Sequence, residues 1–522
     1  MSEQFLETGA QPEAKESLKN SPEAFEEQIS ALFAQYEKLG VKQHRVDSRI
    51  TGLLFEEDIP EDHPWRKRQL EAKNPKAVSD LKYTPETPAI PQTLPGTFAK
   101  EISPLIEALK QLTTEQTEIQ AKIKDLLTKH KDLPQAYYWQ AFYINKTGDG
   151  TRGEMFQLFR QAYEQKDPRA QYWLANHYRY TDPKKAFELL LLAAAAGYPE
   201  AQFILGYDHE RGEDGLTKNF KAAKRLFESA AAQGHLKSLL HLGDNYEWGA
   251  YDVQQDIQTA IDYYKQAVIV SEQKADHHAE AHFRLGKIYA NGKGVEKDLK
   301  EAAKWYRAAA ENGDVAAQRI FGDYCAQGIG GVEKDEKQAV YWYRLAASWR
   351  HIGDTKAQYN LVRCYATGTG VEKDEKKALR WLQIAAQRHH TEAQLQLGHC
   401  YEEGRWGAVK DAKNAVVWYR TAAAQGNGQA SYEMGRCYQE GIGLLRDFKE
   451  ARKNYQLAES RGYTAAGEAL EKLKNPSSNS NSNFSRSSGS SFNFSGPLVQ
   501  SGTPNTTEGE AIELETLTSR RD

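Results

Sequence analysis

The chain has 522 residues, of which 40% are hydrophobic and 27% are charged, and its formal net charge is −4. This near-neutral balance excludes the strongly basic face that nucleic-acid binding requires, and no apolar run approaches the roughly 20 residues of a membrane span. Length alone predicts three or four domains of about 150 residues. Because the polar N-terminus lacks the apolar core of a signal peptide, we expect a cytoplasmic protein, unless a signal-peptide-independent route exports it to a host cell.

Residues 1–100 predict a partly disordered N-terminal region. Within it, apolar residues between Phe25 and Leu39 recur at helical spacing and predict a short amphipathic helix. Residues 55–65 are acidic and broken by prolines, which is typical of a partner-docking motif or, as the pattern favours, of a solvated linker. Four prolines make residues 82–96 an extended linker.

Residues 101–135 predict one amphipathic helix. Six apolar residues in this segment follow the 4-3 spacing of a heptad, with Gln116 as the one polar residue of the seam. They are Leu105, Leu109, Leu112, Ile119, Ile123 and Leu126. The pattern favours a helix that packs on the following domain as its cap. A coiled coil that joins two copies of the chain through residues 101–130 is the alternative.

Residues 136–474 repeat one pattern of about 36 residues. Its clearest copy runs from Ala279 to Gly313, AEAHFRLGKIYANGKGVEKDLKEAAKWYRAAAENG, and the same outline returns after Ala317, Ala357 and Ala393. A fixed period in this range indicates an array of supersecondary units. Eight to nine units fit between the two boundaries, counting a degenerate first unit at Ala136.

Each unit predicts two antiparallel helices. A glycine recurs inside the first helix at Gly206, Gly243, Gly286, Gly322, Gly398 and Gly435. Glycine costs about 1 kcal/mol in a helix relative to alanine, so its return indicates that a second helix lies very close. Asp298 and its equivalents Asp335, Asp374, Asp411 and Asp447 are placed to cap the second helix, with Glu301 as a capping-box partner. Since one pair cannot bury its apolar face alone, the pairs are expected to stack into a solenoid.

The recurring pattern A-x-x-x-L-G-x-x-Y-x-x-G-x-G-V-x-x-D-x-x-x-A-x-x-W-Y-x-x-A-A resembles the Sel1-like repeat, a relative of the tetratricopeptide repeat. The match covers about residues 170–462. The resemblance implies an all-α fold, a right-handed α-solenoid of stacked antiparallel helix pairs. It also implies an interaction scaffold, of the kind found in eukaryotic quality control and signalling and in bacterial proteins that meet host cells.

Residues 475–522 differ from the array in composition. They are rich in serine and asparagine and cannot bury enough apolar surface to order themselves, so we expect a disordered tail. The end of the tail carries Glu508, Glu510, Glu513 and Glu515. This cluster resembles the glutamate-rich C-terminal signals of effectors that intracellular bacteria such as Legionella deliver by type IV secretion. A solubilising tail is the alternative interpretation.

The sequence contains no recognisable catalytic constellation. The turn Gly328-Ile329-Gly330-Gly331 closes one helix and leads to an aspartate cap, whereas a dinucleotide fingerprint must follow a strand. The histidine clusters, His277, His278 and His282 and then His389, His390 and His399, supply no thiolate at zinc-ligand spacing. We therefore expect no cofactor, no metal and no enzyme activity. An enzyme whose site lies in the first 130 residues is the alternative from a different class.

The four cysteines, Cys325, Cys364, Cys400 and Cys437, fall one in each of four first helices. Some secreted Sel1-like proteins brace each unit with two cysteines, and this chain has none in its second helices. We expect four free, buried thiols in a reducing compartment.

The most specific functional prediction is a binding surface on the first helices. The resemblance to tetratricopeptide repeats implies that these helices line the inner face of the solenoid and contact a partner. The residues transferred on that basis are Tyr172, Arg179, Tyr207, Arg211, Trp248, Phe283, Lys287, Arg319, Asp323, Tyr359, Arg363, Tyr432 and Arg436. Aromatic and arginine side chains dominate interface energetics, so we expect an acidic or extended segment of another protein as the ligand. In the alternative interpretation, these arginines pair with Glu210, Glu402 and Glu403 of neighbouring units.

Overall fold

The computed structural model describes residues 21–55, 96–213, 216–250, 253–274, 279–348 and 353–474. Residues 1–20, 56–95 and 475–522 lie outside the described residues. The predictions for the N-terminal segment, the acidic segment, the proline-rich linker and the C-terminal tail fall on these residues. The chain divides into two compact units, Met1–Asp314 and Val315–Asp522.

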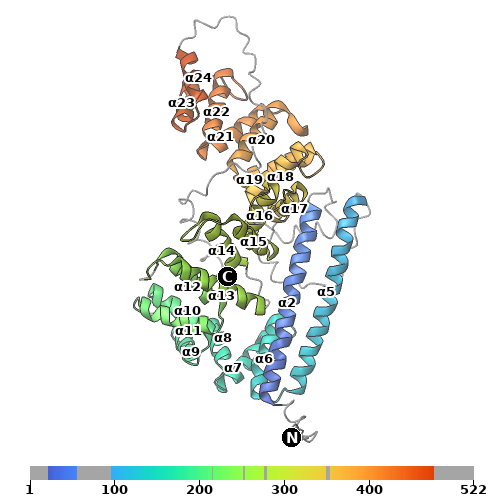
Figure 1. Ribbon diagram of the computed structural model, residues 1–522, viewed down its shortest axis with the longest axis vertical. Coiled ribbons are helices and arrows are strands. Elements are labelled where there is room, and N and C mark those ends of the chain that lie inside the picture. Colours follow the sequence, from blue (N-terminus) through green and yellow to red (C-terminus); the bar gives the residue numbers. More distant parts are fainter. Residues whose placement is uncertain are drawn as a thin grey trace, which may run out of the picture. The chain divides into compact units, whose positions relative to one another are not determined.

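Two long helices open the first unit. α2 (Pro22–Phe55) and α5 (Gly96–Lys129) have 34 residues each and lie side by side in Figure 1. They are antiparallel, because Phe25, Ile29 and Phe33 near the start of α2 pack against Ile123 and Leu127 near the end of α5. With its 34 residues, α2 is much longer than the short helix predicted from Phe25 to Leu39.

The buried seam of α5 agrees only in part with the predicted heptad. Ile102, Ile106 and Leu127 lie outside the predicted seam and are buried, whereas its members Leu105, Leu112, Ile119 and Leu126 are half-buried. Leu109 and Ile123 of the predicted seam are buried, and Gln116 lies against Gly40 of α2. The start of α2 and the end of α5 pack on the first helix of the array, where Phe33 of α2 stacks on Trp139 with 5.3 Å between ring centroids. In the described part of the chain α5 packs along α2, and both helices contact α6 at the start of the array, so we call them the cap helices.

Helix pairs follow in both units. In the first unit they are α6 (Pro134–Thr147) with α7 (Arg152–Glu164), α8 (Pro168–Tyr178) with α9 (Pro183–Ala195), α10 (Pro199–Arg211) with α11 (Phe220–Ala232), α12 (Leu236–Trp248) with α13 (Ile257–Lys274), and α14 (Ala279–Asn291) with α15 (Leu299–Glu311). Each pair also contacts the pair before it. α6 and α7 form the degenerate unit expected at Ala136.

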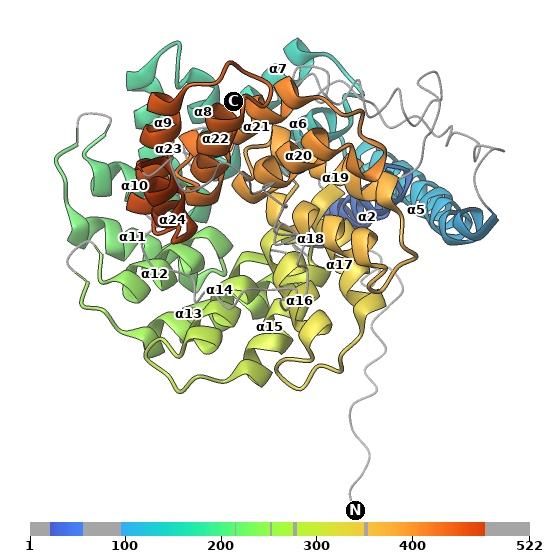
Figure 2. The same cartoon turned by 90° about the horizontal axis from the view of Figure 1, so that it is seen from above.

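The second unit has the same construction. Its pairs are α16 (Val315–Gln327) with α17 (Glu336–Ser348), α18 (Thr355–Thr367) with α19 (Glu375–Gln387), α20 (Thr391–Glu403) with α21 (Ala412–Ala424), and α22 (Gly428–Glu440) with α23 (Phe448–Ser460), closed by the single helix α24 (Ala465–Lys474). A 3-10 turn, η2 (Arg405–Gly407), lies between α20 and α21. Figure 2 shows first helices on the inner side of their neighbours, α14 inside α13 and α15 in one unit, and α18 inside α17 in the other. The expected all-α solenoid is confirmed.

The close contact predicted at the helical glycines is present in all six repeats that carry such a glycine. A Cβ atom built on Gly286 would lie 2.7 Å from Cδ1 of Tyr306 in the second helix. The same holds for the pairs Gly206–Phe227, Gly243–Tyr264, Gly322–Tyr343, Gly398–Tyr419 and Gly435–Tyr455, with nearest distances of 2.5 to 2.8 Å. Carbon atoms prefer about 3.5 to 4.0 Å, so only glycine lets the ring lie flat on the first helix.

The predicted aspartate caps are also confirmed. Asp298 accepts hydrogen bonds from the backbone N–H groups of Lys300 and Glu301, both at 2.9 Å. Asp335, Asp374, Asp411 and Asp447 accept equivalent bonds at the starts of α17, α19, α21 and α23. The capping box predicted at Glu301 is not formed, because its carboxylate accepts from Lys304 at 2.8 Å and the Asp298 backbone N–H donates to the Tyr289 carbonyl at 3.0 Å. Each second helix therefore begins at a fixed point relative to the ring that packs on the glycine.

Candidate partner-binding site on the first helices

Four of the tyrosines that lie over these glycines, Tyr264, Tyr343, Tyr419 and Tyr455, have their hydroxyl bonded to a polar side chain of the first helix, whereas Phe227 over Gly206 has no hydroxyl. Tyr264 donates to Asp244 at 2.6 Å and to Glu247 at 2.8 Å. In the second unit, Tyr343 donates to Asp323 at 2.8 Å, and Tyr455 donates to Gln439 at 2.8 Å. The hydroxyl thus holds a first-helix carboxylate or amide in one position in each of these units.

In three of these repeats, a side chain of the next first helix bonds to the carboxylate that the tyrosine hydroxyl contacts. Arg284 of α14 lies 3.4 Å from Asp244 of α12, and Asn360 of α18 donates to Asp323 of α16 at 3.1 Å. Arg436 of α22 donates to Glu402 of α20 at 2.5 Å. These bonds join residues 34 to 40 positions apart in the sequence. The first helices of neighbouring pairs are therefore linked through buried or half-buried polar side chains.

Several predicted partner-binding residues belong to this network. Arg436 bonds Glu433 at 2.8 Å as well as Glu402, and Asp323 is a buried acceptor that also pairs with Arg319 at 3.0 Å. The pairing of Arg436 with Glu402 is the one that the alternative interpretation expected. The other two acids of that interpretation have different partners, since Glu210 pairs with His241 at 2.8 Å and Glu403 pairs with Arg405.

A second repeated contact involves the aromatic residues of the predicted site. Tyr359 stacks on His390 with ring centroids 4.8 Å apart, and His390 is the N-cap residue of α20. Rings also meet at this position in the pairs Tyr172–Tyr198, Phe203–His235 and Tyr432–Tyr463, with centroids 5.0 to 5.4 Å apart, but these rings are tilted by 52 to 57°. At this position α16 carries Arg319, which bonds Asp354 at 3.2 Å. These side chains join each first helix to the start of the next.

The remaining predicted residues differ in exposure, and Tyr207, Arg211, Phe283 and Lys287 are half-buried. Trp248 is 56% exposed at the end of α12, with Lys293 at 3.4 Å from its ring centroid. Lys287 lies 5.8 Å from the ring centroid of Phe283, and Arg211 lies 5.4 Å from that of Tyr207. All five of these predicted residues are on α10, α12 and α14 of the first unit. Arg179 follows the end of α8, and Arg363 is half-buried on α18.

Burial sets the electrostatics of the network. Burial raises the pKa of the Asp323 carboxyl to about 6, although the nearby Arg319 charge acts in the opposite direction. For Glu402, burial also favours the neutral acid, but the hydrogen bond and charge of Arg436 hold the pKa below its usual range. Burial lowers the pKa of His390 to about 4, so this ring is neutral at pH 7.

One group of side chains in the described part of the chain has the composition of a metal site. Ligand atoms of His399, Glu402 and Glu433 all lie within 4.8 Å of one another. The guanidinium of Arg436 bonds both carboxylates, and Tyr419 bonds both His399 and Glu402. An arginine therefore already supplies the positive charge at the centre of this cluster. The sequence singles out His399 and Glu402 separately but does not join them to Glu433, because the three residues come from two repeats.

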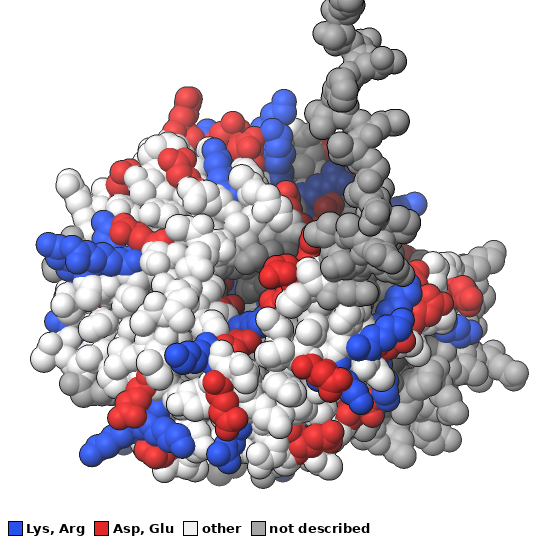
Figure 3. Space-filling view, turned by 90° about the horizontal axis from the view of Figure 1, so that it is seen from below, with Lys and Arg blue, Asp and Glu red and all other residues white. Residues whose placement is uncertain are grey.

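The cysteine prediction is confirmed, since Cys325, Cys364, Cys400 and Cys437 are all free and buried. Burial raises the pKa of Cys364, Cys400 and Cys437 to about 12. Within the described residues, none of the helices is both long enough and apolar enough to cross a bilayer. On the face drawn in Figure 3, acidic and basic side chains are interspersed.

Stacked antiparallel pairs that are bonded through their first helices define an α-solenoid repeat protein. The model of the Sel1 repeat family matches eight segments that together make up more than half of the sequence, and the chain belongs to this family. The matched segments are residues 168–198, 199–235, 236–268, 279–314, 315–348, 355–390, 391–427 and 428–463. The degenerate pair α6–α7 and the two cap helices precede the matched segments.

Individual relatives match over shorter stretches. The uncharacterized protein NMB1327 of Neisseria meningitidis is 30% identical over 167 residues, 31% of this chain and 33% of the relative. The chitin synthase regulator SKT5 of Saccharomyces cerevisiae is 30% identical over 158 residues, 24% and 22% of the two chains. The chain thus spans a third or less of these two relatives.

A solved structure resembles the fold over a longer stretch. The crystal structure of c5321, a protective antigen of uropathogenic Escherichia coli with an SLR fold, is 27% identical and covers 78% of this chain and 90% of its own. Its TM-score is 0.53. This likeness supports the assignment of the array as a Sel1 repeat solenoid.

Proposed function

We propose that the protein is a non-catalytic scaffold that binds a partner protein on its first helices. Family membership supports an interaction role, and so do the names of two relatives, a chitin synthase regulator and an exopolysaccharide production negative regulator of Rhizobium meliloti. The observation that carries the proposal is the linked layer of first helices. Because polar side chains link α10 to α12, α12 to α14, α16 to α18 and α20 to α22, these first helices hold their outward side chains in preorganised positions, which reduces the entropy cost of binding.

We propose that the partner binds on the first helices of the first unit. Arg319, Tyr359, Tyr432 and Arg436 already make contacts within the chain. Phe283, Lys287, Trp248 and Arg211 combine aromatic surface with positive charge on α10, α12 and α14. We propose that these four residues receive an acidic or extended segment. The enzyme alternative remains a prediction, because residues 56–95 lie outside the described residues.

Site-specific cross-linking tests this proposal. Replacing Phe283 with the photoreactive amino acid p-benzoylphenylalanine should trap a partner in cells, and mass spectrometry should identify it. The identified partner should then bind the purified Trp248→Ala, Lys287→Ala variant at least about tenfold more weakly, a loss of about 1.4 kcal/mol. The control is Lys265→Ala with Lys304→Ala, which removes two exposed lysines from the second helices. If the control weakens binding as much as the test variant, the first helices are not the site.

The glutamates near the C-terminus support a second proposal, that a type IV secretion system exports the protein as an effector. The test fuses residues 475–522 to an adenylate cyclase reporter in a secretion-competent bacterium that infects cultured cells. Reporter activity in the host should depend on the secretion system and fall when Glu508, Glu510, Glu513 and Glu515 are changed to alanine. Equal activity from the alanine variant would contradict the role of these glutamates.

A further inference from the structure

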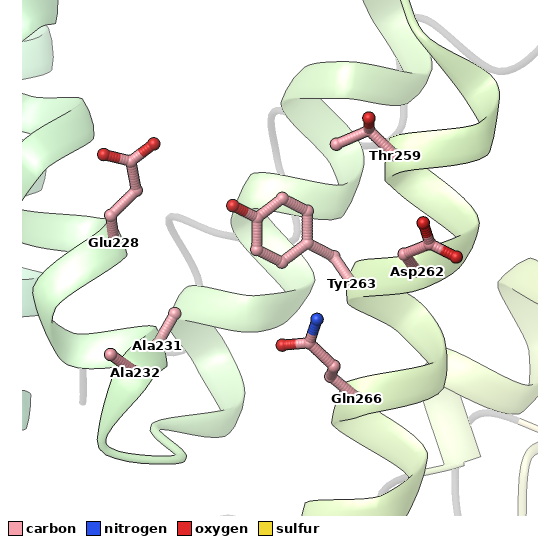
Figure 4. A pocket seen from close by; sticks show the side chains of 7 residues that line it. All are labelled: Glu228, Ala231, Ala232, Thr259, Asp262, Tyr263 and Gln266. Atoms are coloured by element: carbon pink, nitrogen blue, oxygen red, sulfur yellow. The ribbon is translucent and has the colours of Figure 1, made fainter.

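A groove lies between two second helices of the first unit, on the opposite layer from the proposed partner site. It has a volume of about 370 Å³. Its residues from α11 are Glu228, Ala231 and Ala232, and its residues from α13 are Thr259, Asp262, Tyr263 and Gln266. Figure 4 shows the ring of Tyr263 projecting from α13, with its hydroxyl on the side of Glu228. We call this surface the outer groove.

The repeat allows the outer groove to be compared with its equivalents. Glu228 is the ninth residue of its second helix and Asp262 is the sixth residue of the next one. In the other pairs of consecutive second helices that lie in one compact unit, the ninth residue of the first and the sixth residue of the second are Arg160 and Glu188, Leu191 and Arg225, Lys265 and Lys304, Arg344 and Arg380, Gln383 and Val417, and Arg420 and Lys453. Two carboxylates occur together only in the outer groove among these described pairs. Its charge is therefore a local departure from a pattern that is otherwise mostly basic.

The acidic groups of the outer groove have weak partners within the chain. Glu228 lies 3.8 Å from Lys224 and both side chains are exposed, so this pair contributes little. Asp262 accepts a hydrogen bond from Gln258 at 3.3 Å. Tyr263 stacks on Tyr246 with centroids 5.7 Å apart, which fixes the plane of its ring. Burial raises the pKa of Tyr263, and the neighbouring Tyr246 and Glu228 act in the same direction.

We propose that the outer groove binds the arginine side chain of an extended segment in a partner protein. A guanidinium offers planar donors that match carboxylates and a flat face that stacks on an aromatic ring. The outer groove supplies the Glu228 carboxylate and the ring of Tyr263, whose hydroxyl lies on the side of Glu228, and Asp262 adds a second negative charge on the α13 wall. Ala231 and Ala232 are small enough to leave room for the methylene stem. This site takes a basic segment, whereas the proposed site on the first helices takes an acidic one.

Methyl NMR on the full chain tests the proposal, with Ala231 and Ala232 as built-in reporters. The probe is the peptide acetyl-Gly-Ser-Arg-Ser-Gly-amide, and its matched control carries citrulline, a neutral isostere, in place of arginine. We expect saturable shifts of the two alanine methyl groups with a Kd in the millimolar range, which corresponds to about −4 kcal/mol. The citrulline peptide should cause no saturable shift. Equal shifts with the two peptides, or none up to about 10 mM, would overturn the proposal.

Paired variants separate the groove from general charge attraction. Glu228→Gln with Asp262→Asn keeps the shape and removes both charges, so the arginine peptide should bind at least about tenfold more weakly. Glu188→Gln with Glu311→Gln removes two exposed carboxylates from other second helices and should bind as the parent does. Comparable weakening in both variants, or shifts of the exposed Ala195 and Ala424 as large as those of Ala232, would show non-specific binding and overturn the inference.

Discussion

Replacing Gly286 with alanine tests the contact that shapes each helix pair. In an exposed helix this change stabilises by about 1 kcal/mol, because alanine has the higher helix propensity. At Gly286 the new methyl group would lie 2.7 Å from Cδ1 and 2.8 Å from Cε1 of Tyr306, whose side chain is buried. The preferred separation is about 3.5 to 4.0 Å, so the ring must move by roughly 1 Å within a packed interior.

The expected magnitude follows from these two opposing effects. Overpacking costs typically about 1 to 3 kcal/mol, so Gly286→Ala should lose up to about 2 kcal/mol after the propensity gain of about 1 kcal/mol. Gly153 is the matched control, because it also lies in a helix and a Cβ built on it meets nothing within 4 Å. Gly153→Ala should keep or raise stability. The two variants should therefore change the free energy of unfolding in opposite directions.

Urea unfolding followed by circular dichroism gives the sign, and hydrogen exchange gives the location. Stability in a repeat array is shared between neighbours, so amides of α14 and α15 should lose protection first and those of α13 next. In a Tyr306→Ala background the ring is absent and Gly286→Ala should become stabilising, which is a double-mutant cycle for the contact. If Gly286→Ala stabilises the otherwise unchanged chain as Gly153→Ala does, the close-packing argument is wrong.

Three further outcomes are expected. Asp323→Asn should remove a pH dependence of stability. The pKa of Asp323 is about 6 in the folded protein and 3.8 in the unfolded chain, so the folded parent binds more protons between these values and loses up to about 3 kcal/mol of stability as the pH rises from 4 to 6. Urea titrations of the variant should lack this slope. Native protein should resist thiol alkylation at pH 7, and mass spectrometry should find four alkylated cysteines only after non-reducing denaturation; a bridge between Cys364 and Cys400 would contradict this. A chain that ends at Lys474 should melt within a degree or so of the full chain, and a large loss would assign residues 475–522 a structural role.

The sequence predicted local features well, because each of them is encoded within one repeat. The six glycines, the aspartate caps and the free thiols all depend on contacts inside a single helix pair. The length of α2 was missed because its support comes from α5, far along the chain. Gln43 donates to Thr113 at 3.4 Å and Ile50 is fully buried, yet neither residue follows a strong local pattern.

The candidate site could be predicted only in part, for a related reason. The family resemblance located the positions that face along the first helices, but it could not show which side chains are already bonded within the chain. Arg436 reaches Glu402 across 34 residues and Arg319 reaches Asp354 across 35. Such pairs depend on the residues that two neighbouring units happen to carry at matching positions. Only the folded array brings these residues together.

This distribution of contacts also explains why the two layers differ in what they offer a partner. On the first helices, positions near each glycine must match the tyrosine below and the next unit, so a change there alters stability as well as recognition. Arg284 with Asp244 and Asn360 with Asp323 illustrate that double constraint. The sixth and ninth residues of the second helices carry side chains of every class along the array. Some of them also bond to the next first helix, as Arg344 does to Tyr365 and Gln383 does to Tyr401. Glu228 and Asp262 of the outer groove have only weak partners within the chain, so their charges are available to a partner.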